Sequence, residues 1–546
     1  MSALLLKDFH PTPASLPPEH CSYRMKIPSN SSLPVHIHPL NPLQFLLRAA
    51  TIYPHKLAIS HPDVESPVCY TYSVWAQRVQ NLAYALIWYG IKPGDKVAVI
   101  SPNTPMIAEA HHGIIAARAV LTPINTRLTK GEVKYILEHS QSRLILVDHE
   151  YVHLVSDTKI PVIVSKDTGR FGCPYEDFLS KGRQHSKEMG WAGLELELNE
   201  DAPATLCYTS GTTGRPKGNA YETRMNKDSV YFWILPMFHA AGWTFPWSIT
   251  FSFATQITQR SVSNVLVWKH LINSGISHYC GAPTVQIGIV THPDAKTLDR
   301  PVTAIVAGSA PTAHLIGELE KKNIHTYGPF MRGYPHQFWN DLPLDSRAKL
   351  MARQGYTSAL AHDVRVIYQD DSDEPTDVPA DGKTVGEIVT RGNIVMKEYF
   401  RDPEATKAAF RGGYFRSGDL AVMHEDGSIA IQDRSKDIII SGGENASSLS
   451  IEQELAEHPA ILEVAVVARP HPKWGERPCA FVVLTPSAEL QYATKHDVFE
   501  RDLKAFAKGR LPGFACPEWV RVLDELPKTS TGKIMKTALR GIVAKL

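Results

Sequence analysis

Eleven residues near the middle of the chain, Tyr208–Gly218, read YTSGTTGRPKG and combine small hydrogen-bonding groups with one cation. Glycines in such a loop let the backbone approach an anion closely and adopt φ above zero. The candidate phosphate ligands are the backbone amides and hydroxyls of Thr209, Ser210, Gly211, Thr212, Thr213 and Gly214, with Lys217 as the countercharge. The string differs from a Walker A loop, because Gly218 follows the lysine where that motif requires Ser or Thr. A Gly/Thr-rich surface turn is the plainer alternative, but the full string favours phosphate binding.

The whole chain is long and nearly neutral. Its 546 residues suggest roughly three or four domain-sized units. The 57 Lys and Arg nearly balance the 56 Asp and Glu, so no basic excess indicates a nucleic acid or a membrane surface as partner. Apolar runs such as GIIAARAVL end long before the ~20 residues that cross a bilayer, which predicts no membrane span. Seven scattered cysteines form no CxxC pair, so neither a zinc site nor a disulfide framework is indicated.

Helical and strand-like patterns alternate along most of the chain. Residues 72–90 have apolar side chains at helical spacing, whereas 95–101 and 142–148 are short apolar runs typical of buried parallel strands. This order predicts an α/β fold with parallel sheets in a large N-terminal domain of several subdomains. From Gly386 short strands with turn signals follow, and residues 451–470 read as a helix and a strand of a small α+β domain.

Five further strings accompany the loop in order: LPMFHAAGW, VAGSAP, YFRSGDLA, DRSKDIIISGGEN and PKTSTGK. Together with YTSGTTGRPKG they resemble the AMP-forming acyl-activating superfamily, which includes acyl-CoA synthetases, adenylation domains and luciferases. The resemblance extends from about residue 45 to 540 and is nearest to fungal and plant-type acyl-CoA ligases, including peroxisomal ones. It implies an ATP-dependent acyl-CoA ligase that turns a carboxylic acid into an acyl-adenylate and then into the CoA thioester.

The resemblance also implies a domain plan and a set of cofactors. Residues 41–433 would be the large adenylation domain, 434–437 a hinge, and 438–546 a small mobile domain, whereas the proline-rich composition of residues 1–40 predicts an extended lead-in. ATP, Mg²⁺ and CoA are the expected cofactors and co-substrates. The small domain is expected to rotate between adenylation and thioester formation, so that it presents different faces to one site.

Individual residues take roles from the matching motifs. Asp419 would bind the ribose hydroxyls and Arg434 the nucleotide, although a turn-capping aspartate and a surface arginine are the plainer alternatives. Lys533 would bind carboxylate and α-phosphate oxygens during adenylation, and Lys436 would be the hinge residue; without the motifs both would be solvated lysines. His239 would lie at the acyl pocket, or it would be merely a half-buried histidine. Gly308, Ser309, Ala310 and Pro311 would line the adenine or form a turn. Gly442 and Gly443 would lie near the thiol or form a β-turn.

The chain departs from the family pattern in two places. The family follows its adenine segment with a YGxTE-type motif, whereas Tyr327 and Gly328 precede Pro329, Phe330 and Met331, so the magnesium ligand is not identified. The segment after Gly218 is also shorter than the family's. Real deletions and mis-assigned exon boundaries would produce the same gaps. Two alternatives to the acyl-CoA ligase stay open. One is an enzyme that loads a carrier-protein thiol, and the other, suggested by the missing magnesium ligand, is a catalytically impaired nucleotide or acyl binder.

The last three residues, Ala544-Lys545-Leu546, resemble the SKL-type peroxisomal address with alanine in place of serine. An ordinary frayed terminus is the plainer alternative. The C-terminal position favours the address, which predicts recognition by the peroxisomal import receptor and otherwise a cytoplasmic location.

Overall fold

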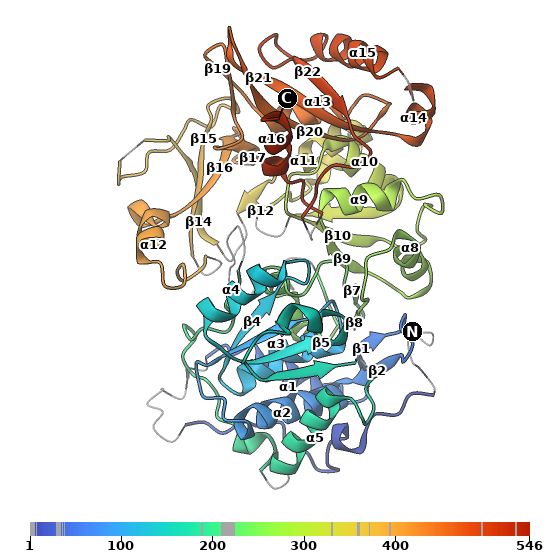
Figure 1. Ribbon diagram of the computed structural model, residues 1–546, viewed down its shortest axis with the longest axis vertical. Helices are drawn as coiled ribbons and strands as arrows, with labels where there is room; N and C mark the ends of the chain where they lie inside the picture. Colours follow the sequence, from blue (N-terminus) through green and yellow to red (C-terminus); the bar gives the residue numbers. More distant parts are fainter. Residues whose placement is uncertain are drawn as a thin grey trace. The chain divides into compact units, whose positions relative to one another are not determined.

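The computed structural model describes residues 6, 8–28, 34, 36–37, 39–166, 168–186, 189–208, 224–328, 331–357, 361–370, 372–392, 395–492, 495–529 and 532–545. The chain divides into two units, Met1–Cys280 and Gly281–Leu546, and each is described by itself (Figure 1).

Parallel strands dominate the first unit. One sheet has the order β4-β3-β5-β6, and its pairs are parallel throughout. Its strands are β3 (Lys96–Ile100), β4 (Val120–Ile124), β5 (Ser142–Asp148) and β6 (Val162–Ser165). A second run of strands in this unit, β9-β7-β8-β1-β2, is parallel except for the terminal β1–β2 pair. It contains β1 (Leu57–His61), β2 (Val68–Thr71), β7 (Val230–Phe232), β8 (Thr255–Ile257) and β9 (His278–Gly281). The strands predicted at 95–101 and 142–148 are thus confirmed.

Helices of the first unit pack on one another as well as on the sheets. Helix α2 (Tyr72–Trp88) is buried from Tyr72 to Leu86, because α3 (Pro105–Ala116) and α5 (Pro174–Ser186) both pack against it. The side chain of Thr71 caps it at the start, and Gly90 follows it with φ +94°. Further α-helices among the described residues of this unit are α1 (Leu43–Ile52), α4 (Lys130–Ser140), α7 (Phe245–Phe251) and α8 (Asn264–Asn273).

A buried ionic cluster ties the N-terminal segment to α2, α3 and α5. The guanidinium of Arg78 donates to Glu109 at 2.5 Å and to Glu176 at 2.7 Å, and it also reaches the hydroxyl of Ser15 at 3.0 Å. Tyr175 donates to the same Glu109 at 2.8 Å. Two carboxylates therefore share one arginine in a place that water does not reach.

Replacing Arg78 by methionine is expected to destabilise the protein by about 3–5 kcal/mol, because two buried carboxylates lose their partner. A lower midpoint of thermal unfolding, followed by circular dichroism, measures the loss. Lys26→Met is the matched control: its ion pair with Glu195 spans 3.4 Å between exposed side chains and should contribute less than about 1 kcal/mol. Equal midpoints for the two variants would contradict the argument.

The second unit begins with α/β structure and continues with an antiparallel sheet. Helix α9 (Pro283–Val290) leads to the parallel pair β10 (Val302–Val306) and β11 (Ile324–Tyr327), which α10 (Ala313–Lys321) connects. Helix α11 (Leu344–Ala352) follows. The antiparallel sheet has the order β14-β15-β16-β17. Its strands are β14 (Ala361–Ile367), β15 (Gly386–Gly392), β16 (Phe415–Met423) and β17 (Ile429–Arg434), with α12 (Pro403–Ala409) between β15 and β16.

The C-terminal part of the second unit is a small α+β structure around a sheet that is covered on both faces (Figure 1, orange to red). Its elements are β18 (Ile439–Ser441), β19 (Glu444–Ala446), α13 (Ser448–Leu455), β20 (Ile461–His471), β21 (Gly475–Leu484), α14 (Pro486–Tyr492), α15 (His496–Lys508), β22 (Trp519–Val522) and α16 (Lys536–Val543). Val464 and Val466 of β20 face the core with α13 and α15, whereas the alternate residues Ala465 and Val467 face α16. The predicted fold class, an α/β protein with parallel sheets and a smaller C-terminal domain, is confirmed.

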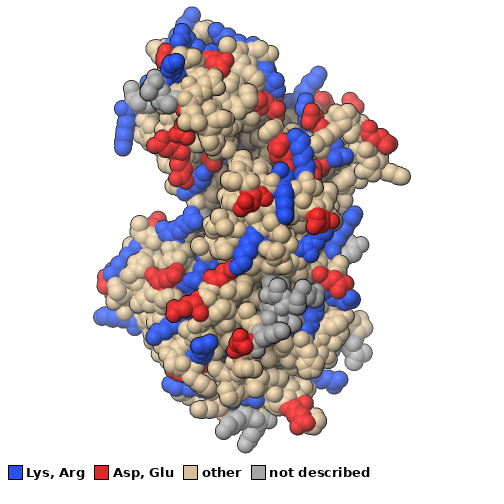
Figure 2. All heavy atoms as spheres, turned by 90° about the vertical axis from the view of Figure 1, so that its right-hand side faces the viewer, with Lys and Arg blue, Asp and Glu red and all other residues tan. Residues whose placement is uncertain are grey.

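Charges on the molecular surface are mixed. Figure 2 shows Lys and Arg interspersed with Asp and Glu on the face that it presents. No helix among the described residues is long and apolar enough to cross a membrane.

Candidate functional site

Asp419 and Arg434 meet across two strands of the second unit. Strands β16 and β17 are antiparallel, and their register sets these two residues directly opposite each other. Arg434 Nε lies 3.0 Å from Asp419 Oδ1, and both side chains are partly exposed. Gly418, with φ +71°, precedes Asp419, and its backbone N–H donates to Glu387 at 2.9 Å. The result is an accessible carboxylate–guanidinium pair at one end of the sheet.

Lys533 belongs to a tight loop that is held against helix α9. Thr529 N–H donates to the carbonyl of Lys533 at 2.7 Å, and Lys533 N–H donates back to the Thr529 hydroxyl at 3.1 Å. The hydroxyl of Thr284, in the first turn of α9, donates to the carbonyl of Gly532 at 2.5 Å. A Cβ added at Gly532 would come within 2.5 Å of that hydroxyl, and φ there is +84°, so the contact requires glycine.

Ala282 connects this loop with the predicted adenine segment. Its Cβ lies 3.8 Å from a Cβ added at Gly532 and 4.0 Å from one added at Gly308. Gly308, Ser309, Ala310 and Pro311 follow β10, and Tyr327 ends the neighbouring parallel strand β11, where it pairs with Ile305. Because carboxyl ends of parallel strands share one edge of a sheet, Gly308 and Tyr327 leave their strands at the same edge, a common place for a nucleotide.

Burial and neighbouring charges shift the pKa values of Asp419 and Lys533. Burial raises the pKa of Asp419 above its usual range, although Arg434 and Lys533 oppose the rise. Burial also lowers the pKa of Lys533, Arg434 lowers it further, and Asp419 opposes the fall. Lys533 therefore lies close enough to the ion pair for the charges to interact. A cluster of two cations and one carboxylate, partly withdrawn from water, is suited to an anionic ligand such as a phosphate.

Lys436, predicted as the hinge residue, and the two glycines predicted to lie near the CoA thiol are close to one another in the sequence but differ in their surroundings. Lys436 is exposed, and its carbonyl accepts from Arg540 at 3.2 Å. Gly442 and Gly443, with φ +66° and +89°, form the two-residue turn between β18 and β19. A Cβ at Gly442 would come within 3.0 Å of the Trp474 ring. Here the two glycines form the turn of a β-hairpin.

The first unit carries the remaining predicted residues. His239 begins a short 3-10 helix (His239–Thr244) and is partly buried. The phosphate loop, including Thr209, Ser210, Gly211, Thr212, Thr213, Gly214 and Lys217, lies outside the described residues, as do Pro329, Phe330 and Leu546. Tyr208, the residue before the loop, is described, and its hydroxyl lies 2.7 Å from Nδ1 of His139.

No three His, Cys, Asp or Glu of the described ranges are grouped so as to hold a metal ion. Tyr327 and Gly328 are followed in the sequence by no carboxylate before Asp341. The described donor set therefore does not fit a protein-held magnesium ion.

Two residues of the site lie outside the sequence motifs. Thr284 anchors the Lys533 loop, yet in the sequence it is one of many threonines near a helix start. Glu387 accepts from the N–H of Gly418, beside Asp419. A polar residue in the first turn of a helix that follows a buried strand is the signal that would have marked Thr284.

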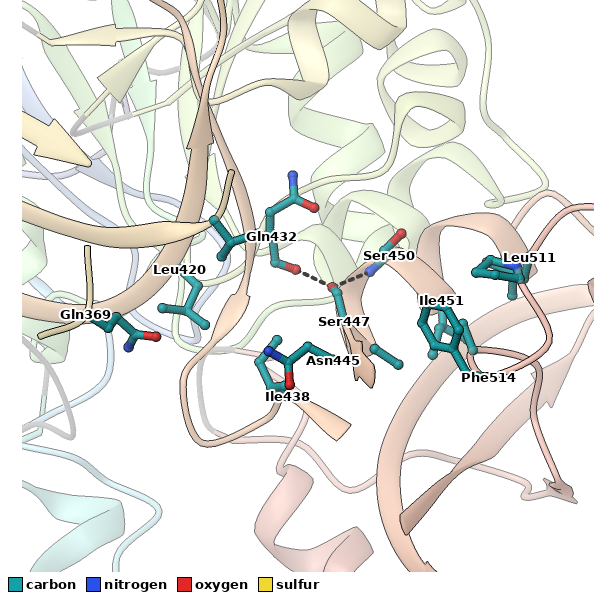
Figure 3. Close-up of a pocket in the computed structure, with 14 residues that line it drawn as sticks. Gln369, Leu420, Gln432, Ile438, Asn445, Ser447, Ser450, Ile451, Leu511 and Phe514 are labelled. Atoms are coloured by element: carbon teal, nitrogen blue, oxygen red, sulfur yellow. Dashed lines mark hydrogen bonds between the residues drawn. The ribbon is translucent and has the colours of Figure 1, made fainter. Parts of the chain in front are cut away.

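The second unit also contains a cavity of 320 Å³ between the β14–β17 sheet and the C-terminal part (Figure 3). Every described residue of its lining is uncharged. The lining includes Gln432, Asn445, Ser447, Ile451 and Phe514, and none of the residues assigned to the nucleotide.

Two family models match the chain. The model described as AMP-binding enzyme matches residues 46–400, and that of the AMP-binding enzyme C-terminal domain matches residues 450–533.

Curated relatives cover nearly the whole chain. The peroxisomal acetate/butyrate–CoA ligase of Arabidopsis thaliana is 38% identical over 560 residues, which cover 93% of this chain and 95% of the relative. The peroxisomal trans-cinnamate:CoA ligase of Petunia hybrida is 36% identical, covering 92% and 94%. The peroxisomal benzoate–CoA ligase of Arabidopsis thaliana is 36% identical, covering 93% and 94%. Since the first alignment is longer than this chain, that relative contains stretches that the chain lacks.

Solved structures share the fold. A benzoate CoA ligase from Burkholderia xenovorans LB400 superimposes with a TM-score of 0.76 at 22% identity, covering 92% of this chain and 100% of that one. The anthranilate CoA ligase AuaEII, in complex with anthranoyl-AMP, gives a TM-score of 0.78 at 21% identity, covering 94% and 99%.

Proposed function

Since this chain belongs to the AMP-binding enzyme family and is an ATP-dependent acyl-CoA ligase, we propose that Asp419, Arg434 and Lys533 bind the nucleotide in its active site. The direct pairing of Asp419 with Arg434 across β16 and β17, at 3.0 Å, supports this assignment more than any other observation. Gly308, Ser309, Ala310, Pro311 and Tyr327 would line the adenine, and the loop from Thr209 to Lys217 would hold the phosphates.

The first chemical step is adenylation. A carboxylate oxygen of the acid attacks the α-phosphorus of ATP; an O–P bond forms, the bond to the β-phosphate bridging oxygen breaks, and pyrophosphate leaves. Negative charge develops on oxygens during this step, so positioned cations stabilise the transition state. Lys533 is the group that would reach both the carboxylate and the α-phosphate, while Asp419 accepts hydrogen bonds from the ribose hydroxyls.

The second step makes the thioester. The thiol sulfur of CoA attacks the acyl carbon, the carbon–oxygen bond to phosphate breaks, AMP leaves with the electron pair, and the thiol proton passes to solvent. Lys436 would act as the hinge between the large domain (41–433) and the small one (438–546), which brings Gly442 and Gly443 to the thiol. His239 would line the acyl pocket.

Short-chain and small aromatic carboxylic acids are the proposed substrates, because the relatives are named for acetate, butyrate, trans-cinnamate and benzoate. Incubating the purified protein with ATP, Mg²⁺ and each of these acids, and measuring pyrophosphate exchange and acyl-CoA, tests the proposal. Exchange and thioester formation with at least one acid are expected. A folded protein that performs neither reaction with any of them would refute it.

One observation favours a second function, that of an impaired nucleotide or acyl binder: no Thr-Glu pair follows Tyr327 and Gly328. This reading predicts ATP binding by calorimetry without exchange. Restoring a Thr-Glu pair after Gly328 should then bring back turnover, because a carboxylate that holds Mg²⁺ on the triphosphate contributes strongly to charge stabilisation.

A peroxisomal location is proposed from the Ala544-Lys545-Leu546 tail and from the peroxisomal relatives. The tail would be read by the peroxisomal import receptor. A fluorescent fusion at the N-terminus should enter peroxisomes, and deletion of the last three residues should leave it in the cytosol; import without the tail would contradict the proposal.

A further inference from the structure

Strand β17 and helix α13 are joined by hydrogen bonds that span the residues expected to act as the hinge. Asp433, only 4% exposed, lies directly before that segment. Its Oδ2 accepts from the backbone N–H of Ser448 at 2.6 Å, from the Ser448 hydroxyl at 2.7 Å and from Leu449 N–H at 3.4 Å. These partners all come after the hinge, in the first turn of α13.

A second hydrogen bond joins β17 to the start of α13. The hydroxyl of Ser447 donates to the carbonyl of Gln432 at 2.5 Å and accepts from Ser450 N–H at 2.9 Å. Figure 3 shows this hydroxyl between the two groups, at the wall of the uncharged cavity. We call the five residues Gln432, Asp433, Ser447, Ser448 and Leu449 the hinge latch.

The hinge latch is connected to the segment that carries Lys533. Lys536, three residues after Lys533, donates to the Ser448 hydroxyl at 2.6 Å and pairs with Glu452 of α13 at 2.8 Å. Glu452 in turn accepts from Val466 N–H of β20 at 2.7 Å. Attraction to Glu452 and Asp433 raises the pKa of Lys536 in spite of its burial. The Ser448 hydroxyl therefore bonds both to Asp433, which precedes the hinge, and to Lys536, which follows the loop that carries Lys533.

A rotation about residues 434–437 would separate Asp433 from α13. The carboxylate and the N–H groups of Ser448 and Leu449 would then lose buried, charge-assisted hydrogen bonds, which are among the stronger ones in proteins. The loop contact from Thr284 to Gly532 belongs to the same arrangement. The hinge latch thus stabilises the orientation described here, in which the Lys533 loop is bonded to Thr284 and the charge of Lys533 acts on Asp419.

We propose that Asp433 is a positioning residue for adenylation: through Ser448 it holds the C-terminal part in the orientation that presents Lys533. This proposal rests on the function proposed above. Asp433 acts through Ser448 and Lys536 and has no assigned contact with substrate. Opening the hinge latch should therefore slow the step that needs Lys533 and spare the step that follows rotation.

The test separates the two half-reactions in Asp433→Ala and Ser448→Ala. Pyrophosphate exchange measures adenylation, and acyl-CoA formation from chemically prepared acyl-adenylate measures the second step. We expect adenylation to fall roughly 10-fold in each variant, and the second step to keep its rate or become faster. Ser448→Ala is needed because Asp433 also accepts from the N–H of Arg434, at 2.8 Å, whereas Ser448 is remote from Arg434 in sequence.

Asp426→Ala is the matched control. Asp426 caps Ser428 in the β16–β17 turn with the same kinds of bond, from the N–H at 2.9 Å and from the hydroxyl at 2.6 Å, but on one side of the hinge. Both half-reactions should keep their rates. A fall by the same factor in both half-reactions of Asp433→Ala and Ser448→Ala would overturn the proposal, since a general loss of structure does not discriminate between them.

Limited trypsin digestion gives a readout that does not depend on activity. Lys436 and its neighbour Ser435 are exposed, so cleavage after Arg434 or Lys436 should become faster when the hinge latch is opened. Unchanged cleavage in both variants would also overturn the proposal. If the unmodified protein exchanged pyrophosphate with no acid, the proposed function would fail, while the digestion would still decide whether the hinge latch exists.

Discussion

Replacing Lys533 by methionine should lower acyl-adenylate formation by roughly 100- to 1,000-fold, the size of effect seen when one stabilising donor is removed from a transition state. Methionine keeps the length of the side chain and removes its charge. Because the lysine is assigned to adenylation alone, thioester formation from prepared acyl-adenylate should change by less than about 3-fold. Pyrophosphate exchange and acyl-CoA release measure the two steps.

Lys504→Met is the control for this substitution, since Lys504 pairs with Glu500 on the surface of α15 at 2.8 Å and lies in the same unit. It should leave both steps unchanged. Equal losses in both steps for Lys533→Met would contradict the assignment to adenylation.

The pH profile of adenylation provides a second check on Lys533. The lysine acts as an ammonium ion, so the rate should fall as rising pH removes its proton. Because burial lowers its pKa, the fall should begin below the value of about 10.4 that is usual for lysine. Lys533→Arg should move this alkaline limb upwards, since arginine stays protonated. An alkaline limb that is the same in both proteins would assign it to another group.

Replacing Asp419 by alanine should raise the KM for ATP by roughly 10- to 100-fold, because the carboxylate no longer accepts from the ribose hydroxyls and even one hydrogen bond to a charged group contributes about 1.5–3 kcal/mol. The loss also leaves Arg434 without the partner that lies 3.0 Å away. Initial rates at varied ATP concentration measure the change.

A double-mutant cycle with Arg434→Met provides the control for Asp419. The two residues contact each other, so their effects on ATP binding should be coupled and the double variant should lose less than the two single losses combined. Strictly additive losses would show that the ion pair does not act as one unit towards the nucleotide.

Features formed by residues that are neighbours in the chain could be predicted from the sequence. The helix at 72–90, the strands at 95–101 and 142–148 and the α+β character of the C-terminal part each depend on local patterning. The motif around Asp419 and Arg434 also predicted a shared site, and the strand register explains it, because the two residues pair directly across β16 and β17.

Contacts between distant residues could not be predicted in this way. Thr284 and Gly532 are 248 positions apart, and only the folded chain brings the hydroxyl to the loop. Asp433 likewise appears in the sequence as one more charged residue of DRSKD, and its buried contact with Ser448 depends on how α13 packs. The proline-rich composition of residues 1–40 gives no sign that Ser15 is 1% exposed and bonded to Arg78.

The buried ionic cluster has a consequence for biosynthesis. Ser15 leaves the ribosome early, but Glu176 emerges much later, and Arg183, which donates to the carbonyl of Leu16, is 167 residues behind its partner. At translation speeds of about 5–20 residues per second, the first segment waits roughly 10–30 s before its last partner exists. During that interval the segment lacks its contact with Arg183 of α5, whereas its partners Arg78 and Asn81 of α2 are already present.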